Sequence, residues 1–97
     1  MTRKTPRPWV LVTGASGGIG LELACGFARD GHPLVLTARS TERLAAAAAA
    51  CRERGAPRVE TIPLDLGAPE GAAALAAALA RREIVPGVLV NNAGYGL

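Results

Sequence analysis

Short apolar runs alternate along this chain with longer segments of helical periodicity. Runs such as Leu34-Val35-Leu36 are typical of strands that are buried on both faces of a parallel sheet. In the segments between the runs, apolar residues recur three or four positions apart, as Ile19, Leu23 and Phe27 do. The pattern predicts strands over residues 9–13, 33–38, 59–64 and 87–91, and helices over 18–29, over 41–54 and from near Pro69.

Residues suited to helix ends separate these segments. Gly31 stands where a left-handed cap would end the first helix, Ser40 can cap the second helix, and Gly55 ends it. In a sheet of this kind the expected strand order is third, second, first, fourth, and right-handed crossovers then put the first two helices on one face and the third on the other. The expected fold class is therefore α/β: a partial, Rossmann-like doubly wound parallel sheet of about four strands and three helices.

Composition limits how stable such a sheet can be. The 97 residues allow one domain at most, and although 49% are hydrophobic, 20 are alanine and three are aromatic. The fourth strand would form an apolar edge, and the third helix alone would cover its face of the sheet. We therefore expect the isolated chain to be marginally stable and to self-associate.

The net charge of +3 comes largely from Arg3, Lys4 and Arg7, ahead of the first strand. Residues 1–8 are interpreted as a basic, flexible and solvated leader rather than as a nucleic-acid-binding arm. No apolar run approaches the roughly 18 residues that a membrane span needs. We therefore expect a soluble, cytoplasmic protein with neither a nucleic-acid partner nor a membrane partner.

The two cysteines, Cys25 and Cys51, show no zinc-binding or redox spacing. Both fall on the apolar stripe of a predicted helix. They are expected to be reduced and buried as small hydrophobic residues, and no metal site is predicted.

The first strand runs directly into a glycine-rich turn, Gly14-Ala15-Ser16-Gly17-Gly18-Ile19-Gly20, which opens the first helix. Gly14 allows the tight turn, Gly18 lets the backbone approach a pyrophosphate, and Gly20 lets the helix pack on the sheet. The pyrophosphate charge would lie against the unpaired N–H groups of the helix start. This context predicts a dinucleotide-binding loop, with a plain glycine-rich turn as the alternative. Ser16 can serve as a helix cap or as a phosphate donor.

The end of the second strand indicates which dinucleotide is bound. An acid about 20 residues past the loop suits the ribose 2′-hydroxyl of NAD, whereas an arginine suits the 2′-phosphate of NADP. Here the strand ends in Thr37-Ala38-Arg39-Ser40, without an acid. Arg39 could pair with the phosphate through its planar fork, and Ser40 could add a donor. The pattern favours NADP(H), with NAD(H) as the alternative; a solvated arginine at a helix entry is the other interpretation.

Three motifs follow three of the strands in a fixed order: Thr13-Gly14-Ala15-Ser16-Gly17-Gly18-Ile19-Gly20, then Asp65-Leu66, then Asn91-Asn92-Ala93-Gly94. From Trp9 to its end, the chain resembles the short-chain dehydrogenase/reductase family. The TGxxxGxG spacing distinguishes this family from the GxGxxG of other dinucleotide-binding proteins.

The resemblance implies a role for each motif. Residues 14–20, Gly17 and Ile19 included, would cradle the pyrophosphate. Asp65 would accept a hydrogen bond from the adenine amino group, with Leu66 beside the ring. Asn92, Ala93 and Gly94 would line the adenosine ribose and approach the nicotinamide. A plain turn residue at position 65 and a plain strand exit at 91–94 are the alternatives.

Members of this family interconvert carbonyl compounds and alcohols with a serine and a YxxxK tyrosine and lysine. No YxxxK occurs within the 97 residues, and Tyr95 has no lysine after it, so no catalytic residue is assigned. Residues 9–97 are interpreted as the truncated cofactor-binding half of an NADP-dependent oxidoreductase, inactive alone. The resemblance implies a homo-oligomeric parent that transfers hydride between NADPH and a small carbonyl or alcohol substrate. A non-enzymatic dinucleotide-binding module and an inert fragment are the alternatives.

Overall fold

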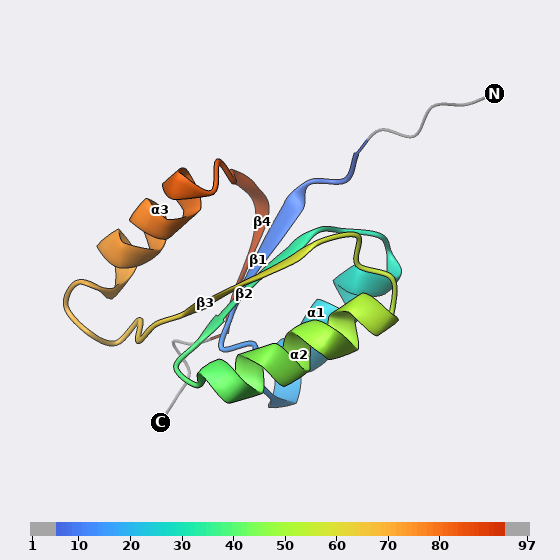
Figure 1. Ribbon diagram of the computed structural model, residues 1–97, viewed down its shortest axis with the longest axis horizontal. Helices are drawn as coiled ribbons and strands as arrows, with labels where there is room; N and C mark the ends of the chain where they lie inside the picture. Colours follow the sequence, from blue (N-terminus) through green and yellow to red (C-terminus); the bar gives the residue numbers. More distant parts are fainter. Residues whose placement is uncertain (1–5, 93–97) are drawn as a thin grey trace.

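Strands and helices alternate strictly in the computed structural model, which describes residues 6–92. Figure 1 shows strands β1 (Trp9–Thr13), β2 (Leu34–Ala38), β3 (Val59–Pro63) and β4 (Pro86–Asn91), with helices α1 (Gly18–Arg29), α2 (Thr41–Glu53) and α3 (Gly71–Arg81) between them. Every predicted strand and helix is present, and no first or last residue differs from the prediction by more than two positions. Two of the predicted site residues, Ala93 and Gly94, lie outside the described residues, as does most of the leader.

The four strands form one parallel sheet in the order β3-β2-β1-β4, which confirms the predicted topology. In the centre, Val12 of β1 is in register with Leu36 of β2 and Val90 of β4. Because all strands run in the same direction, their carboxyl ends share one edge of the sheet. Residues that follow the strands are brought together there.

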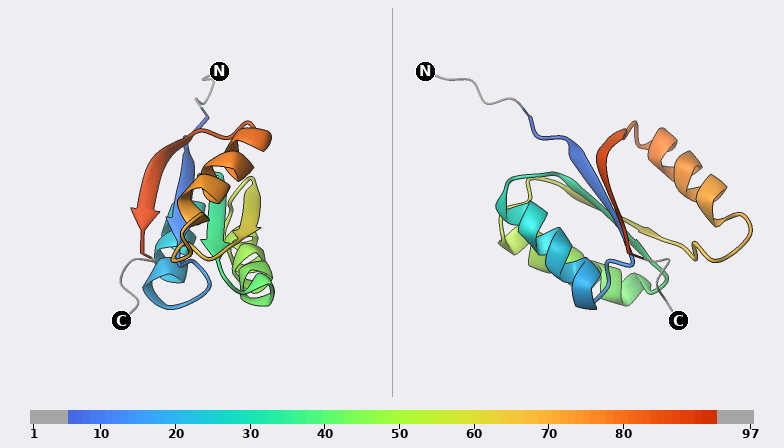
Figure 2. Two further views of the ribbon diagram at one scale, coloured as in Figure 1. Left: turned by 90° about the vertical axis from the view of Figure 1, so that its left-hand side faces the viewer. Right: turned by 180° about the vertical axis from the view of Figure 1, so that it is seen from behind.

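The helices cover the two faces unequally, as expected (Figure 2). On one face, α1 and α2 pack with the sheet around fully buried side chains that include Leu34, Leu36 and Leu44. On the other face, α3 alone packs over a smaller cluster that contains Leu11 and Val35. Burial of a leucine or valine side chain stabilises a fold by about 1.5 to 3 kcal/mol, so most of the packing energy lies on the two-helix face.

Three of the four predicted helix ends are confirmed, including Gly55, which follows α2 with a positive φ of 118°. Gly31 adopts the left-handed conformation at φ 84° after α1, and the Ser40 hydroxyl accepts a hydrogen bond of 3.2 Å from the Arg43 amide. The cap proposed for Ser16 is wrong. Gly17 occupies the N-cap position of α1 in an extended conformation, and no side chain caps this helix.

Helix α3 begins at Gly71, two residues after the predicted start at Pro69. The chain first completes a turn, in which the Ala68 amide donates to the Asp65 carbonyl oxygen at 3.1 Å. Gly71 is buried against this turn, and a Cβ atom there would lie 2.6 Å from the Asp65 carbonyl oxygen. The helix therefore starts only where the backbone has cleared the turn.

The two cysteines meet between α1 and α2. Both are free and buried, as predicted, in the core of the two-helix face. Burial, and to a smaller extent the neighbouring Cys25, raise the pKa of the Cys51 thiol to about 11. A thiol with such a pKa stays protonated near neutral pH and packs as a small hydrophobic group.

Strand β4 forms one edge of the sheet of described residues. Its side chains alternate between exposed and half-buried, and Leu89 keeps 61% of its surface exposed. Within residues 6–92, none of the helices is both long and apolar enough to span a bilayer.

Candidate functional site

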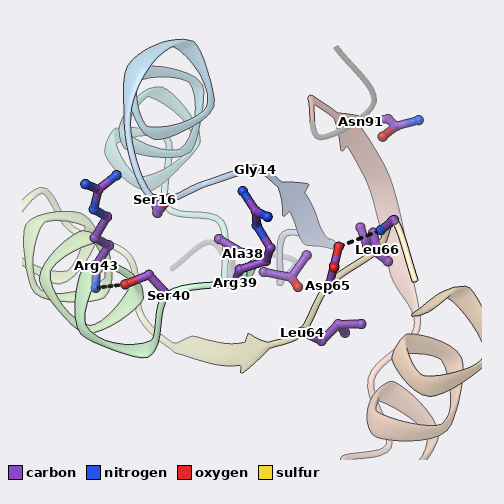
Figure 3. A pocket seen from close by; sticks show the side chains of 12 residues that line it. Gly14, Ser16, Ala38, Arg39, Ser40, Arg43, Leu64, Asp65, Leu66 and Asn91 are labelled. Carbon is purple, nitrogen blue, oxygen red and sulfur yellow. Dashed lines mark hydrogen bonds between the residues drawn. The ribbon is translucent and has the colours of Figure 1, made fainter. Parts of the chain in front are cut away.

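A hollow of about 820 Å³ opens at the carboxyl ends of the strands (Figure 3). Each of the four strands contributes to it, either with its last residues or with the loop that follows. The lining consists of Gly14, Ser16, Thr37, Ala38, Arg39, Ser40, Arg43, Leu64, Asp65, Leu66, Gly67 and Asn91. Open parallel sheets bind their ligands at this edge, and the volume is in the usual range for small-molecule sites.

The glycine turn leaves β1 through Gly14, whose φ of 63° is a conformation that favours glycine. Helix α1 then packs very closely on this turn. A Cβ atom at Gly20 would lie 2.2 Å from the Gly14 carbonyl oxygen, so only glycine fits at this position without a shift of the backbone. Gly20 therefore has the helix-packing role that the sequence predicts.

The start of α1 is suited to a negatively charged group. It has no side-chain cap and no acidic residue in its first turn. The first N–H groups of a helix have no partner within the helix, and they carry its positive dipole end. A Cβ atom at Gly17 or Gly18 would meet no atom within 4 Å, so the space beside this turn is open. These features fit a pyrophosphate.

Hydrogen bonds tie the end of β4 to the glycine turn. The Asn92 amide donates to the Thr13 hydroxyl at 2.8 Å, and the Asn92 side chain donates to the Gly14 carbonyl oxygen at 3.2 Å. The Thr13 hydroxyl is also 3.1 Å from the side-chain oxygen of Asn91. Asn92 thereby holds the turn in place from the neighbouring strand, whereas Asn91 lines the hollow.

The β2 end supplies the positive charge of the hollow. Arg39 and Ser40 follow the strand directly, and both line the hollow together with Arg43 from the first turn of α2. The side chains of Arg39 and Arg43 are exposed, and neither makes a hydrogen bond or ion pair with another described residue. The ion pairs of residues 6–92 join Glu60 to Arg58 and to Arg82, well away from this hollow.

The loop after β3 forms the opposite wall. The Asp65 carboxylate accepts a hydrogen bond of 2.8 Å from the Gly67 amide. This contact is typical of a turn residue, the alternative role that the sequence suggests for Asp65. Its other carboxylate oxygen makes no hydrogen bond with a described residue, and Asp65 lines the hollow beside Leu66. The structure therefore leaves Asp65 able to accept a hydrogen bond from a ligand as well.

Thr37 is an unusual polar residue at the base of the hollow. It is fully buried, and its hydroxyl has no hydrogen-bond partner among residues 6–92. Leaving a buried hydroxyl unpaired costs about 1 to 3 kcal/mol. A buried hydroxyl normally has a hydrogen-bond partner, and a ligand or a water molecule could be that partner for Thr37.

The structure thus brings six of the predicted residues to one hollow: Gly14, Ser16, Arg39, Ser40, Asp65 and Leu66. Four others, Gly17, Gly18, Ile19 and Gly20, belong to the adjoining turn and helix start but do not line the hollow, and neither does Asn92. Sequence reasoning did not assign Asn91, Arg43 or Thr37. A basic residue in the first turn of a helix, where the dipole disfavours it, was the available signal for Arg43.

Taken together, the sheet order and the hollow define a Rossmann-like α/β unit with its site at the strand ends. A family model described as short chain dehydrogenase matches residues 8–96. The chain therefore belongs to the short-chain dehydrogenase family.

Individual relatives agree with this assignment. The hydroxysteroid 11-beta-dehydrogenase 1-like protein of Macaca fascicularis is 49% identical over 61 residues, which cover 63% of this chain and 21% of that protein. Among solved structures, the L-sorbose reductase of Gluconobacter frateurii, complexed with NADPH and L-sorbose, is similar with a TM-score of 0.86 at 38% identity. That match covers 95% of this chain and 35% of the reductase.

A short-chain dehydrogenase from Sphingobium yanoikuyae, in complex with NADPH, is 48% identical with a TM-score of 0.69. The match covers 75% of this chain and 28% of that one. The chain therefore spans about a fifth of the length of the curated relative and about a third of the solved ones.

Proposed function

We propose that this chain forms the cofactor-binding portion of an NADP(H)-dependent oxidoreductase, which transfers hydride between NADPH and a small carbonyl or alcohol substrate. The observation that carries the proposal is the position of Arg39. Its guanidinium lies at the end of β2 in the same hollow as Ser16 and Asp65, and no acid stands at that strand end. The two solved relatives described above, both complexed with NADPH, support the same cofactor.

Different residues of the hollow would bind different parts of the dinucleotide. The start of α1 would hold the pyrophosphate, and Asp65 would accept a hydrogen bond from the adenine amino group. Arg39 and Ser40 would bind the 2′-phosphate by charge-assisted hydrogen bonds. The bound nicotinamide would supply the hydride. A cytoplasmic location and a homo-oligomeric parent enzyme are part of this proposal.

The cofactor preference is tested by the substitution Arg39→Asp. A charge-assisted hydrogen bond contributes about 1.5 to 3 kcal/mol, and solvent exposure of Arg39 favours the lower end of this range. We therefore expect the 97-residue chain to bind NADPH more tightly than NADH by about tenfold, and Arg39→Asp to abolish this preference. Titration of both cofactors by isothermal calorimetry measures the two dissociation constants.

Arg7→Asp serves as the matched control, because Arg7 is exposed and precedes β1 at the opposite end of the strands. It makes the same change of charge and should leave the ratio of the two constants unchanged. Equal affinity of the unsubstituted chain for NADPH and NADH would contradict the proposal. An unchanged ratio in Arg39→Asp would remove Arg39 from it.

Catalysis is a separate expectation. Without a tyrosine and lysine pair of the YxxxK kind, the 97-residue polypeptide should oxidise NADPH in the presence of aldehydes or ketones no faster than buffer does. Turnover by the pure polypeptide that disappears in Gly18→Asp would show that its own residues carry the chemistry.

A further inference from the structure

No contact between described residues stabilises the charged side chain of Arg43. It occupies the third position of α2, where its backbone amide donates to the Ser40 hydroxyl. A positive side chain in this first turn faces the positive end of the helix dipole, which is unfavourable for an isolated helix. No carboxylate among residues 6–92 forms an ion pair with it, although Glu42 stands next to it in the sequence.

Arg43 and Arg39 flank the cap residue. Figure 3 shows the two arginine side chains on either side of Ser40, both extending toward the side of the hollow where Gly14 and Ser16 lie. All three residues line the hollow. Asp65, the carboxylate among the lining residues, is on the loop after β3, and one of its oxygens is already occupied by the Gly67 amide.

The hydrogen bond of the cap also orients Ser40. Because the Ser40 oxygen accepts from the Arg43 amide, its own hydroxyl proton remains available for a ligand. Two guanidinium groups, one hydroxyl donor and the start of α2 therefore lie along the same side of the hollow, on either side of and at Ser40. A phosphomonoester has three terminal oxygens and a charge of about −1.5 to −2, which one arginine fork cannot fully match.

We infer that Arg43 acts together with Arg39 as a second guanidinium for the 2′-phosphate, and that it is a specificity-determining residue for NADP(H). The inference rests on the proposed function, and it adds a residue that the strand-end motif does not include. The unfavourable position of Arg43 in the free helix is offset when the phosphate binds. Thr37 lines the same hollow, and its buried hydroxyl has no hydrogen-bond partner among residues 6–92.

The test uses the 97-residue chain and its variants Arg43→Gln and Arg43→Lys, with Arg81→Gln as the matched control. Arg81 is exposed at the end of α3, does not line the hollow, and has no side-chain hydrogen bond or ion pair with a described residue. The probes are NADPH, NADH and two isomeric nucleotides, adenosine 2′,5′-bisphosphate and adenosine 3′,5′-bisphosphate. The two isomers have the same charge and differ only in the place of one phosphate.

We expect Arg43→Gln to weaken binding of NADPH and of the 2′,5′ isomer by about five- to tenfold. Binding of NADH and of the 3′,5′ isomer should change by less than about twofold, and Arg43→Lys should restore part of the loss because it keeps the charge without the fork. The melting temperature of free Arg43→Gln should equal or exceed that of the unsubstituted chain, since a misplaced cation is removed. Arg81→Gln should change none of these affinities.

Two results would overturn the inference while leaving the proposed function intact. One is a chain that prefers NADPH and loses nothing in Arg43→Gln. The other is an equal loss for both isomeric bisphosphates, which would mean that Arg43 acts only through its general field. A chain that binds NADPH and NADH equally, or neither of them, would instead overturn the proposed function itself and the inference with it.

Discussion

Replacing Gly20 by alanine should destabilise the chain, although alanine is the better helix former. The added Cβ atom would lie 2.2 Å from the Gly14 carbonyl oxygen and 2.9 Å from the Asn92 side-chain nitrogen. Real Cβ atoms essentially never approach another heavy atom within 3.0 Å, so the turn and α1 would have to separate by at least 0.8 Å, which is 3.0 minus 2.2. This shift disturbs the contact on which the predicted pyrophosphate site depends.

The cost can be estimated from its parts. Forcing an extra methyl group into a packed contact costs about 1 to 3 kcal/mol. Loss of the hydrogen bond between Asn92 and Gly14 adds about 1 kcal/mol, and the higher helix propensity of alanine returns up to about 1 kcal/mol. The free energy of unfolding should therefore fall by about 1 to 3 kcal/mol.

Gly26 provides the matched control on the same helix. A Cβ atom there would meet no atom within 4 Å, so Gly26→Ala should raise the free energy of unfolding by about 0.5 to 1 kcal/mol. Thermal unfolding followed by circular dichroism compares the two variants, at roughly 4–8 °C for each kcal/mol in a domain of this size. If Gly20→Ala melts at or above Gly26→Ala, the close packing of the turn on α1 is not what the structure indicates.

Of three further predictions, two concern the core and one concerns the sheet edge. Because burial raises the pKa of Cys51 from 9.0 to about 11, the folded chain should hold on the order of 100-fold less thiolate at this position than the unfolded chain near pH 8, and labelling by a thiol reagent should be correspondingly slow until urea is added. The same shift means that the free energy of unfolding should fall as pH rises from about 9 toward 11, where the unfolded chain releases this proton first; urea titrations at several pH values check the sign, and a rise over this interval would contradict it. At the edge, Leu89→Lys should lower self-association of the 97-residue chain, because an exposed lysine opposes pairing between edge strands, and light scattering after size exclusion measures the mass. If the unsubstituted chain, with Leu89, is monomeric, β4 does not mediate self-association.

The fold was largely predictable from local patterns. Apolar runs such as that of β2 and helix stops such as Gly31 mark the elements, and the handedness of the crossovers in a sheet of this order then decides which face each helix covers. The start of α3 was misplaced because it depends on the close approach of Gly71 to Asp65, which no local propensity reveals. The meeting of Cys25 with Cys51 likewise depends on how α1 and α2 pack.

The candidate site was predictable where a motif stands at a strand end. Arg39, Ser40 and Asp65 meet in one hollow because parallel strands place their carboxyl ends together. The contact of the Asn92 side chain with Gly14 was not foreseen, since it joins two neighbouring strands across 78 positions of sequence. Of the two roles considered for Ser16, the helix cap is excluded because Gly17 takes the extended N-cap position, which the sequence does not show.

Binding of NADP(H) in the hollow at the carboxyl ends of the strands can be observed directly. The isotopically labelled 97-residue chain is titrated with NADP⁺, and the amide chemical shifts are followed by two-dimensional NMR. If the cofactor binds there, the largest shift changes fall on the start of α1, on Arg39 and Ser40, and on Asp65 and Leu66. Changes centred on the opposite end of the sheet, around Arg29 and Arg58, or no saturable change at all, would show that NADP(H) does not bind in this hollow.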